Sequence, residues 1–423
     1  MRSLRVTVVG GGPAGLFLAS LLRTADPSGE VTVYERNAPD ATFGFGVVLS
    51  ARTMTRLRAA DPLIWSRLVA AGVDWDGIEF HRGGRTVSYA GHPLTAISRR
   101  TLLRILQERA DATGARLVFG TEVDASVADA GADVVVLAAG ANCALRDAWR
   151  ERFGTSAEGG GGRYIWCGVE MPFDRLSFCF ADGPAGSLSA HAYPYAAGLA
   201  TYIVTTDEES WRAAMPHAVA GAPGRPGESD EVSLRALSEA FRDHLGGRAL
   251  IGNNSRWAEF QVIRNARFGD GNRVLIGDAA HTAHPSVGSG TKLALDDAAA
   301  LADALLAEPS VPAALARYEA ERRPAVERSQ AFAEPSMRWW EGYRERLYLE
   351  LPQLGFHYLT RTSALDYSRL RRRDARAVDQ AEQHFARRAP AGRPGLLADA
   401  APSPADQVAM RNIVIGCYDL NFL

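Results

Sequence analysis

The stretch that decides the fold runs from Arg5 to Gly15 and reads RVTVVGGGPAG. Its first five residues are mostly β-branched and apolar, a composition that predicts a buried strand. The glycines at 10, 12 and 15 then follow with GxGxxG spacing, and residues 16–23 are rich in Leu and Ala, as in a helix. A strand, a glycine-rich turn and a helix in this order are typical of a site that binds the pyrophosphate of a dinucleotide.

Each part of this motif has its own physical role. The first glycine permits a tight turn, the second lets the backbone approach a pyrophosphate, and the third lets helix and strand pack closely. A second β-branched run, residues 31–34, ends at Glu35, where a carboxylate can accept both ribose hydroxyls. An ordinary glycine-rich turn would not explain this acid. We expect the cofactor contacts of this region to come from Gly10, Gly12, Ala14, Gly15, Glu35 and Arg36.

Composition narrows the class of protein. The chain has 423 residues, 47% of them apolar and 23% charged, which is a normal globular balance with room for two lobes. A formal net charge of -2 favours neither nucleic acid nor a membrane surface as partner. No apolar run approaches the roughly 20 residues that cross a bilayer. The four cysteines share no CxxC spacing, so we expect reduced thiols and a cytoplasmic location.

The rest of the chain interleaves two kinds of structure. Residues 133–137 and 274–276 are further apolar strands, residues 164–204 resemble antiparallel strands, and the chain after 306 is mostly helical. We expect an α/β fold with a discontinuous Rossmann-like domain of the glutathione-reductase type (1–72, 98–163 and 268–330). A second, mainly antiparallel β-sheet domain for substrate (73–97 and 164–267) and a C-terminal helical region with a tail (331–423) complete the prediction. A plain NAD dehydrogenase is not usually interleaved in this way.

The stretch from Val274 to Leu301, VLIGDAAHTAHPSVGSGTKLALDDAAAL, carries a second candidate site. Ligands of open α/β folds bind beyond the carboxyl ends of strands, so Asp278 is placed to accept hydrogen bonds from a polyol. The small-residue loop at 285–290 permits a flat ring to approach the backbone, and the helix after it can stabilise negative charge. The contacts expected here come from Asp278, Pro285, Gly288, Ser289 and Gly290.

The two histidines of this stretch lie three residues apart. A metal site would need a third ligand, and no suitable one is evident, so we expect no metal. His281 is expected to pack and hydrogen-bond locally, whereas His284 is expected to approach the flat ring or the substrate.

Several motifs together give a family resemblance. They are the glycine turn, residues 133–146, GFGVVLS (44–50), AGHPLTAISRRTLLRILQERA (90–110), YIWCG (164–168), AHAYPY (190–195), GDAAHTAHPSVGSGTKLALDDA (277–298) and YEAERRPAV (318–326). With these motifs the chain resembles the single-component FAD-dependent aromatic hydroxylases of the p-hydroxybenzoate hydroxylase type. Within that family it is most similar to the aryl-CoA group, that is, salicylyl-CoA 5-hydroxylase and 2-aminobenzoyl-CoA monooxygenase.

The resemblance implies FAD as cofactor, NAD(P)H as co-substrate and O2 as oxidant. It implies hydroxylation of an activated aromatic ring through a flavin C4a-hydroperoxide, on an aryl-CoA or carrier-tethered thioester, by a monomer or homodimer. Two alternatives stay open: a monooxygenase of a free aromatic or indolic metabolite, and a flavin-binding protein without turnover.

The resemblance also assigns residues. Gly12, Gly15 and Glu35 would hold the adenosine half of FAD, and Arg100, in preference to Arg99, would reach its phosphate or ribityl region. Asp278 would bind ribityl hydroxyls, and the loop of Pro285, Gly288 and Gly290 would border the isoalloxazine. The candidates for catalysis are Pro285, His284 and His92, and the candidates for lining the substrate pocket are Tyr193 and Tyr195.

Two further features concern NAD(P)H and the thioester. The Asp-Gly pair of the family falls at Ala139-Gly140, and the alanine puts the usual NAD(P)H contact in doubt. The basic run at residues 371–373 could meet the phosphates of a CoA or carrier thioester, although a solvated charged face is the simpler interpretation.

Overall fold

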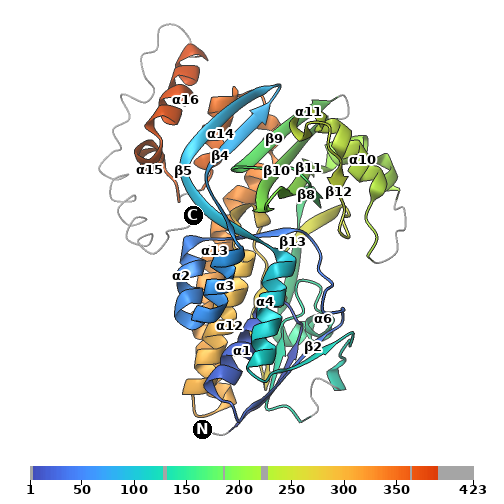
Figure 1. Ribbon diagram of the computed structural model, residues 1–423, viewed down its shortest axis with the longest axis vertical. Coiled ribbons are helices and arrows are strands. Elements are labelled where there is room, and N and C mark those ends of the chain that lie inside the picture. The colour runs from blue at the N-terminus through green and yellow to red at the C-terminus, as the bar shows by residue number, and fades with distance from the viewer. Residues whose placement is uncertain (1–2, 127–130, 184–185, 221–226, 363, 389–423) are drawn as a thin grey trace.

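A parallel sheet in the lower half of the molecule carries the glycine-rich turn (Figure 1). The computed structural model describes residues 3–388 except 127–130, 184–185, 221–226 and 363. The tail from 389, with Cys417, and most of the Pro/Gly-rich loop at 221–228 lie outside the described residues.

The parallel sheet is assembled from segments that are far apart in the sequence. Its order is β14 (Gly269–Asp270), β15 (Arg273–Leu275), β7 (Val134–Leu137), β1 (Arg5–Val9), β2 (Glu30–Glu35) and β6 (Arg116–Phe119). Strand β1 pairs in parallel with both β2 and β7, and β7 pairs in parallel with β15. All four residues of β7 are buried, as expected for a strand covered on both faces.

Helices pack against this sheet, and their buried residues form a hydrophobic core with those of the strands. The helices of this half are α1 (Pro13–Ala25), α2 (Ala51–Ala60), α3 (Pro62–Ala71), α4 (Arg99–Ala112), α6 (Ala144–Ala148), α7 (Arg150–Phe153) and α12 (Gly290–Ala307). Helices α1, α4 and α12 lie side by side in Figure 1, and their buried residues join the strands in one cluster. Gly277, in the 3-10 turn η1 (Gly277–Ala279), packs between α1 and α12, where a Cβ atom would lie 3.4 Å from Ala14 and 3.3 Å from Ala294.

A larger, mainly antiparallel sheet forms the upper half. Its order is β12 (Leu250–Ile251), β8 (Thr155–Val169), β11 (Leu199–Asp207), β10 (Gly186–Ala196), β9 (Leu176–Gly183), β4 (Val73–Arg82), β5 (Arg85–Ser98) and β3 (Gly46–Leu49), and β13 (Ala258–Asn265) also pairs with β8. The β4–β5 hairpin turns at Gly83 and Gly84, which have φ of 54° and 72°. This is the hairpin that the sequence predicts, because a two-residue turn of this kind needs positive φ.

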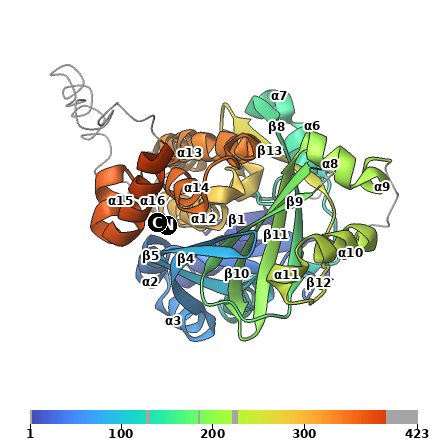
Figure 2. The same cartoon turned by 90° about the horizontal axis from the view of Figure 1, so that it is seen from above.

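Helices cover both faces of the larger sheet. On one face lie α13 (Val311–Glu341), α14 (Leu351–Leu359), α15 (Tyr367–Arg373) and α16 (Ala375–Arg388), with the 3-10 turns η2 (Pro285–Val287) and η3 (Tyr343–Arg346). On the other lie α8 (Glu208–Ala214), α9 (Pro216–Val219), α10 (Glu231–Ala240) and α11 (Arg242–Leu245). Figure 2 shows α13 and α14 on one side of this sheet and α8, α9 and α10 on the other. Alternate residues of β9 point to opposite sides, since Phe178 packs with Trp340 of α13 and Cys179 packs in the cluster of α10 and α11.

The expected fold class is confirmed, while the expected domain limits stay a prediction. Sheet membership departs from those limits in two places, because β3 and the first half of β8 belong to the larger sheet although both fall in ranges assigned to the nucleotide domain. Helix α4 begins at Arg99, directly after Ser98, and the helical stretch from Glu231 to Leu245 is interrupted at Phe241. Within the described ranges, no helix has the length and apolar character needed to cross a membrane.

Candidate active site

The glycine turn leaves an open cradle in front of α1. Gly10 has φ of 119°, and a Cβ atom there would lie 2.3 Å from the carbonyl oxygen of Ala138. A Cβ atom on Gly15 would lie 2.2 Å from the carbonyl oxygen of Gly10. At Gly12 the nearest atom would be 4.0 Å away, so space remains beside the backbone. Two glycines are therefore required by packing, and the third borders a space that suits a pyrophosphate.

Glu35 is fixed at the end of β2, next to this cradle. Its Oε2 accepts a hydrogen bond from the backbone N–H of Gly11 at 2.8 Å, and its Oε1 accepts from the backbone N–H of Asn37 at 2.9 Å. Oε1 also accepts from Asn37 Nδ2 at 2.6 Å, so the lone pair left for a ribose hydroxyl is on Oε2. The neighbouring Arg36 is exposed. The residues of this region thus fit the adenosine half of a dinucleotide.

The arginine that reaches the interior is Arg99, whereas the expectation that Arg100 contacts the cofactor stays a prediction. Helix α4 begins at Arg99, whose backbone N–H donates to the carbonyl of Phe45 at 2.7 Å. Burial lowers the pKa of Arg99, although the neighbouring Asp278 and Tyr193 act in the opposite direction. Arg100 is exposed, because successive residues of a helix point about 100° apart.

Asp278 lies in the turn η1, just beyond the carboxyl end of β15. Its side chain is solvent-accessible, but protein surrounds it, and this burial raises the pKa of Asp278 while Arg99 and His281 oppose the rise. A Cβ atom on Gly290 would lie 3.8 Å from Asp278 Oδ1, so the start of α12 faces the same carboxylate. A carboxylate beside a guanidinium in this position suits the hydroxyls of a ribityl chain.

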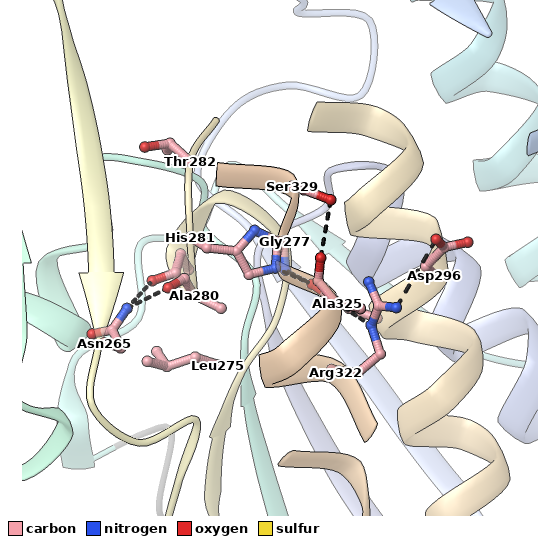
Figure 3. Close-up of polar contacts among 12 residues, drawn as sticks. Asn265, Leu275, Gly277, Ala280, His281, Thr282, Asp296, Arg322, Ala325 and Ser329 are labelled. Carbon is pink, nitrogen blue, oxygen red and sulfur yellow. Dashed lines mark hydrogen bonds and ion pairs between the residues drawn. The ribbon is translucent and has the colours of Figure 1, made fainter. Parts of the chain in front are cut away.

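A buried ion cluster holds the turn that carries Asp278. Asp297 of α12 accepts from the backbone N–H of Gly277 at 2.9 Å, from His281 Nε2 at 2.7 Å and from Arg322 Nε at 2.7 Å. Figure 3 shows His281 and Arg322 converging from the turn after β15 and from α13. Burial alone would raise the pKa of Asp297, but His281 and Arg322 outweigh it, so that the pKa is lowered. The local role expected for His281 is confirmed.

A small cavity lies between the larger sheet, the loop after Asp278 and α13. Its lining includes His191, Ile203 and Tyr164 from the sheet, His284, Pro285 and Ser286 from the loop, and Trp340 and Glu341 from α13. The raised pKa of Tyr164, due to burial and then to Asp278, indicates that the cavity adjoins the space in front of Asp278. The structure therefore brings the expected residues His284 and Pro285 together at this cavity.

A chain of hydrogen bonds fixes the tautomer of His284. Its Nδ1 accepts from the backbone N–H of Ser286 at 3.3 Å and lies 2.7 Å from Ser286 Oγ. Ser286 Oγ lies 2.7 Å from Ser336 Oγ, which accepts from Arg361 Nε at 2.8 Å. Because the backbone N–H of Ser286 only donates, Nδ1 carries no proton, the Ser286 hydroxyl donates to it, and the proton of the neutral imidazole is left on Nε2.

His284 is a neutral group in this setting. Burial, together with the charges of His191 and Arg361, lowers the pKa of His284 to about 3. Burial and Arg361 likewise lower the pKa of His191 to about 4. His284 can therefore donate a hydrogen bond from Nε2 at neutral pH, but it is too weak a base to take up a proton there.

The structure places three other candidates away from this cavity. Both ring nitrogens of His92 are buried without a partner, and burial, then Arg373, lowers its pKa to about 4. His92 precedes Arg99 by seven residues of extended strand, roughly 20 Å, so β5 carries it away from the site. Tyr193 lies two residues after His191 on β10, so both side chains point to the same face of the sheet. Its hydroxyl donates to the carbonyl of Gly46 at 3.0 Å, and burial raises the pKa of Tyr193 to about 12. Tyr195 is half-buried beside Phe45, at 6.5 Å between ring centres.

The sequence missed Arg361 and His191. Arg361 lies 75 residues from Ser286, whose carbonyl accepts from Arg361 Nη2 at 3.1 Å. No local pattern marks such a contact. His191 lies within the quoted AHAYPY segment, and its alternation with Tyr193 on β10 is the signal that could have revealed it.

Comparison with known proteins agrees with this geometry. A family model described as "FAD binding domain" matches residues 3–333. The chain belongs to this family. It is an FAD-dependent monooxygenase, with NAD(P)H as the co-substrate typical of the class. The resemblance found in the sequence is thereby confirmed.

Two curated relatives are similar over most of the chain. Salicyloyl-CoA 5-hydroxylase of a Streptomyces species is 44% identical over 92% of this chain and 75% of its own length. 3-hydroxy-4-methyl-anthranilyl-[aryl-carrier protein] 5-monooxygenase of Streptosporangium sibiricum is 41% identical over 80% and 89%. Among solved structures, 2-methyl-3-hydroxypyridine-5-carboxylic acid oxygenase superposes with a TM-score of 0.66 over 81% of this chain and 94% of its own, at 20% identity, which supports the fold.

Proposed function

We propose that this monooxygenase hydroxylates the aromatic ring of an aryl thioester, carried by CoA or by a carrier protein. The observation that carries the proposal is the similarity to two enzymes named for such substrates, over 92% and 80% of the chain. Arg163, which lines the cavity, is already bound by Glu208 at 2.5 Å and Glu259 at 3.4 Å. A thioester carbonyl is neutral, so it needs no cation there, whereas a free benzoate would.

The residues that would hold FAD follow from the geometry above. The turn of Gly10, Gly12 and Gly15 with α1 would take the pyrophosphate, and Glu35 the ribose. Arg99 and Asp278 would take the ribityl region. The backbone of 288–290 would border the flavin ring, since space is open beside Gly288. Bound FAD supplies electron transfer from NAD(P)H and activation of O2, which the side chains here cannot supply.

The chain itself would orient the substrate and exclude water. Trp340, Ile203 and Phe260 give the cavity apolar walls. His284 would donate from Nε2 to an oxygen of the substrate, either the thioester carbonyl or a ring hydroxyl. Such a hydrogen bond would hold the ring in one orientation for hydroxylation. Since its pKa is about 3, His284 stays a neutral imidazole at pH 7 and keeps only the proton on Nε2.

The test is NAD(P)H oxidation by the FAD-loaded protein, with products identified by mass. The panel pairs salicylate and anthranilate with their CoA thioesters. Substrate-stimulated oxidation and gain of one oxygen atom on a thioester alone is the expected result. Turnover of the free acids alone would refute the thioester substrate. Bound flavin with no stimulated oxidation on any compound would favour the alternative of a flavin-binding protein without turnover.

The proposal extends to O2 as oxidant, a cytoplasmic location and a monomer or homodimer. The buried free thiols of Cys143, Cys167 and Cys179 agree with a reducing compartment. Oxygen uptake during turnover and the mass of the FAD-loaded protein in solution test the first and last of these points.

A further inference from the structure

A second hollow, on the other side of α13 from the cavity, has three arginines among its eight lining residues. Its volume is about 350 Å³, which exceeds the size of a phosphate group. Its polar lining consists of Arg338, Arg346, Arg361, His357 and Glu334, with the ring of Trp339 beside them. We call it the arginine hollow.

Two of its three guanidinium groups have no carboxylate partner among the described residues. Arg338 forms an ion pair with Glu334 one helical turn away. Arg346 instead donates to the carbonyl of Gly342 and lies 5.9 Å from the ring centre of Trp339. Arg361 lies 3.7 Å from the ring centre of Tyr358 and donates to serine and carbonyl oxygens. The hollow therefore holds an excess of about two positive charges.

The other groups leave this charge uncompensated. His357 Nδ1 accepts from Trp339 Nε1 at 2.8 Å, and burial followed by Arg346 lowers the pKa of His357, which keeps the imidazole neutral. Stacking on aromatic rings holds both arginines in place, and each has more of its five N–H donors than these contacts use. Planar guanidinium groups bind phosphate with charge-assisted, often bidentate hydrogen bonds.

We propose that the arginine hollow binds the phosphate of the pantetheine arm of an aryl thioester. This deepens the proposed function and rests on it. The phosphate next to pantetheine is common to CoA and to the prosthetic arm of a carrier protein, so one site serves either form. The arm between this phosphate and the thioester is long and flexible, which lets the ring lie in the cavity while the phosphate stays outside it.

Arg361 links the hollow to the cavity. Its guanidinium lines the hollow and donates to Ser286 and Ser336, and Ser286 lines the cavity next to His284. A phosphate at Arg361 would thus lie at the far end of the hydrogen-bond chain that fixes the tautomer of His284. Substrate binding and orientation of the donor would share one residue.

The basic run at 371–373 is a weaker candidate for the same task. Arg371 is bound by Asp379 at 2.9 Å and by Glu382 at 3.2 Å, so its charge is already neutralised. Arg372 and Arg373 are exposed on α15 and line neither the cavity nor the hollow. The structure favours the solvated-face interpretation of this run.

The test uses the FAD-loaded full chain with Arg346→Met, which leaves the His284 chain intact. The KM for salicyloyl-CoA should rise about tenfold, the value of one charge-assisted hydrogen bond, with kcat unchanged. The KM for salicyloyl-N-acetylcysteamine, which lacks phosphate, should not change. Arg346→Lys keeps the charge and should stay within about threefold of the wild type. Arg372→Met is the matched control and should have no effect.

Two further measurements identify the ligand. Salicyloyl-phosphopantetheine should show the same rise in KM as the CoA thioester; a rise for CoA alone would overturn the assignment to the shared phosphate. A rise in the KM for NADPH without one for thioesters would assign the hollow to NADPH and overturn the proposal. An equal effect of Arg372→Met would show a diffuse surface field instead of a site.

Binding without turnover separates the two proposals. Calorimetry of CoA with the FAD-loaded protein should give a Kd that rises about tenfold in Arg346→Met. If CoA binds in this way and no thioester is hydroxylated, phosphate binding by the arginine hollow is supported and the proposed function is refuted. If thioesters are hydroxylated and neither KM nor Kd responds to Arg346→Met, phosphate binding by the arginine hollow is refuted and the proposed function is supported.

Discussion

Replacing Asp297 by Asn tests whether the buried ion cluster supports the cofactor turn. The carboxylate is fully buried and accepts three hydrogen bonds, from Gly277, His281 and Arg322. An amide of the same size keeps one acceptor oxygen and puts an NH2 group where the second oxygen was. If the oxygen faces His281 and Gly277, the NH2 group faces Arg322 Nε, so that donor meets donor and the buried guanidinium keeps only its more distant partner, Asp296 at 4.0 Å.

The expected loss of stability is large. Removing one partner of a buried ion pair costs about 3–5 kcal/mol, a substantial part of the roughly 5–15 kcal/mol by which domains are stable. If the bond to Gly277 weakens as well, at about 1 kcal/mol, the turn before Asp278 loosens and FAD affinity falls by about fivefold. Since the folded-state pKa of Asp297 is lowered, this contribution is present above the unfolded value of 3.8 and is lost as the pH falls below it.

The assay is urea unfolding at pH 7, followed by circular dichroism and by flavin release. Asp303→Asn is the matched control, because Asp303 lies on the same helix and is exposed. The control should change the free energy of unfolding by less than about 0.5 kcal/mol. If Asp297→Asn proves as stable as Asp303→Asn and retains FAD equally well, the cluster does not support the turn and the reasoning is wrong.

Four further predictions extend these tests. Gly15→Ala should abolish FAD binding or soluble expression, since its Cβ would lie 2.2 Å from a backbone oxygen; an FAD-replete variant would contradict this. Arg99→Met should raise the Kd for FAD about tenfold, while Arg100→Met should change it less than about twofold, measured by fluorescence titration. His92→Leu should flatten the stability loss between pH 7 and pH 4, worth roughly 3 kcal/mol, because a folded-state pKa of about 4 lets only the unfolded chain bind a proton from about pH 6.5 downwards. His284→Ala should lower kcat about tenfold or more without moving the acid limb of the pH–rate profile; a moved limb would show that His284 titrates there.

The parts of the structure that follow from short-range patterns could be predicted from the sequence. The order of strand, glycine turn, helix, strand and Glu35 is local, and each step has a steric or electrostatic reason within about thirty residues. Helix α2 begins and ends where expected, because Ser50 caps it through its side chain, which accepts from Thr53 N.

The features that the sequence could not give depend on rotation and on distant contacts. The choice between Arg99 and Arg100 depends on the residue at which α4 begins, because one step rotates a side chain by about 100°. His92 is only seven residues from Arg99 in the sequence, but both lie at or near β5, a 14-residue extended strand that separates them in space. Arg361 meets Ser286 across 75 residues, and periodicity contains no information about such a pair.

The interleaved order of the parallel sheet has a consequence for synthesis of the protein. Strand β1 needs β7 on one side, β7 needs β15, and α12 closes the core only at residue 307. A ribosome that adds about 5–20 residues per second makes the glycine turn roughly 15–60 s before its last partner emerges. During that interval the nascent chain exposes apolar strands and has no complete site for FAD. Chaperone supply and translation speed across the first 307 residues should therefore govern the yield of flavin-loaded protein more than FAD supply does.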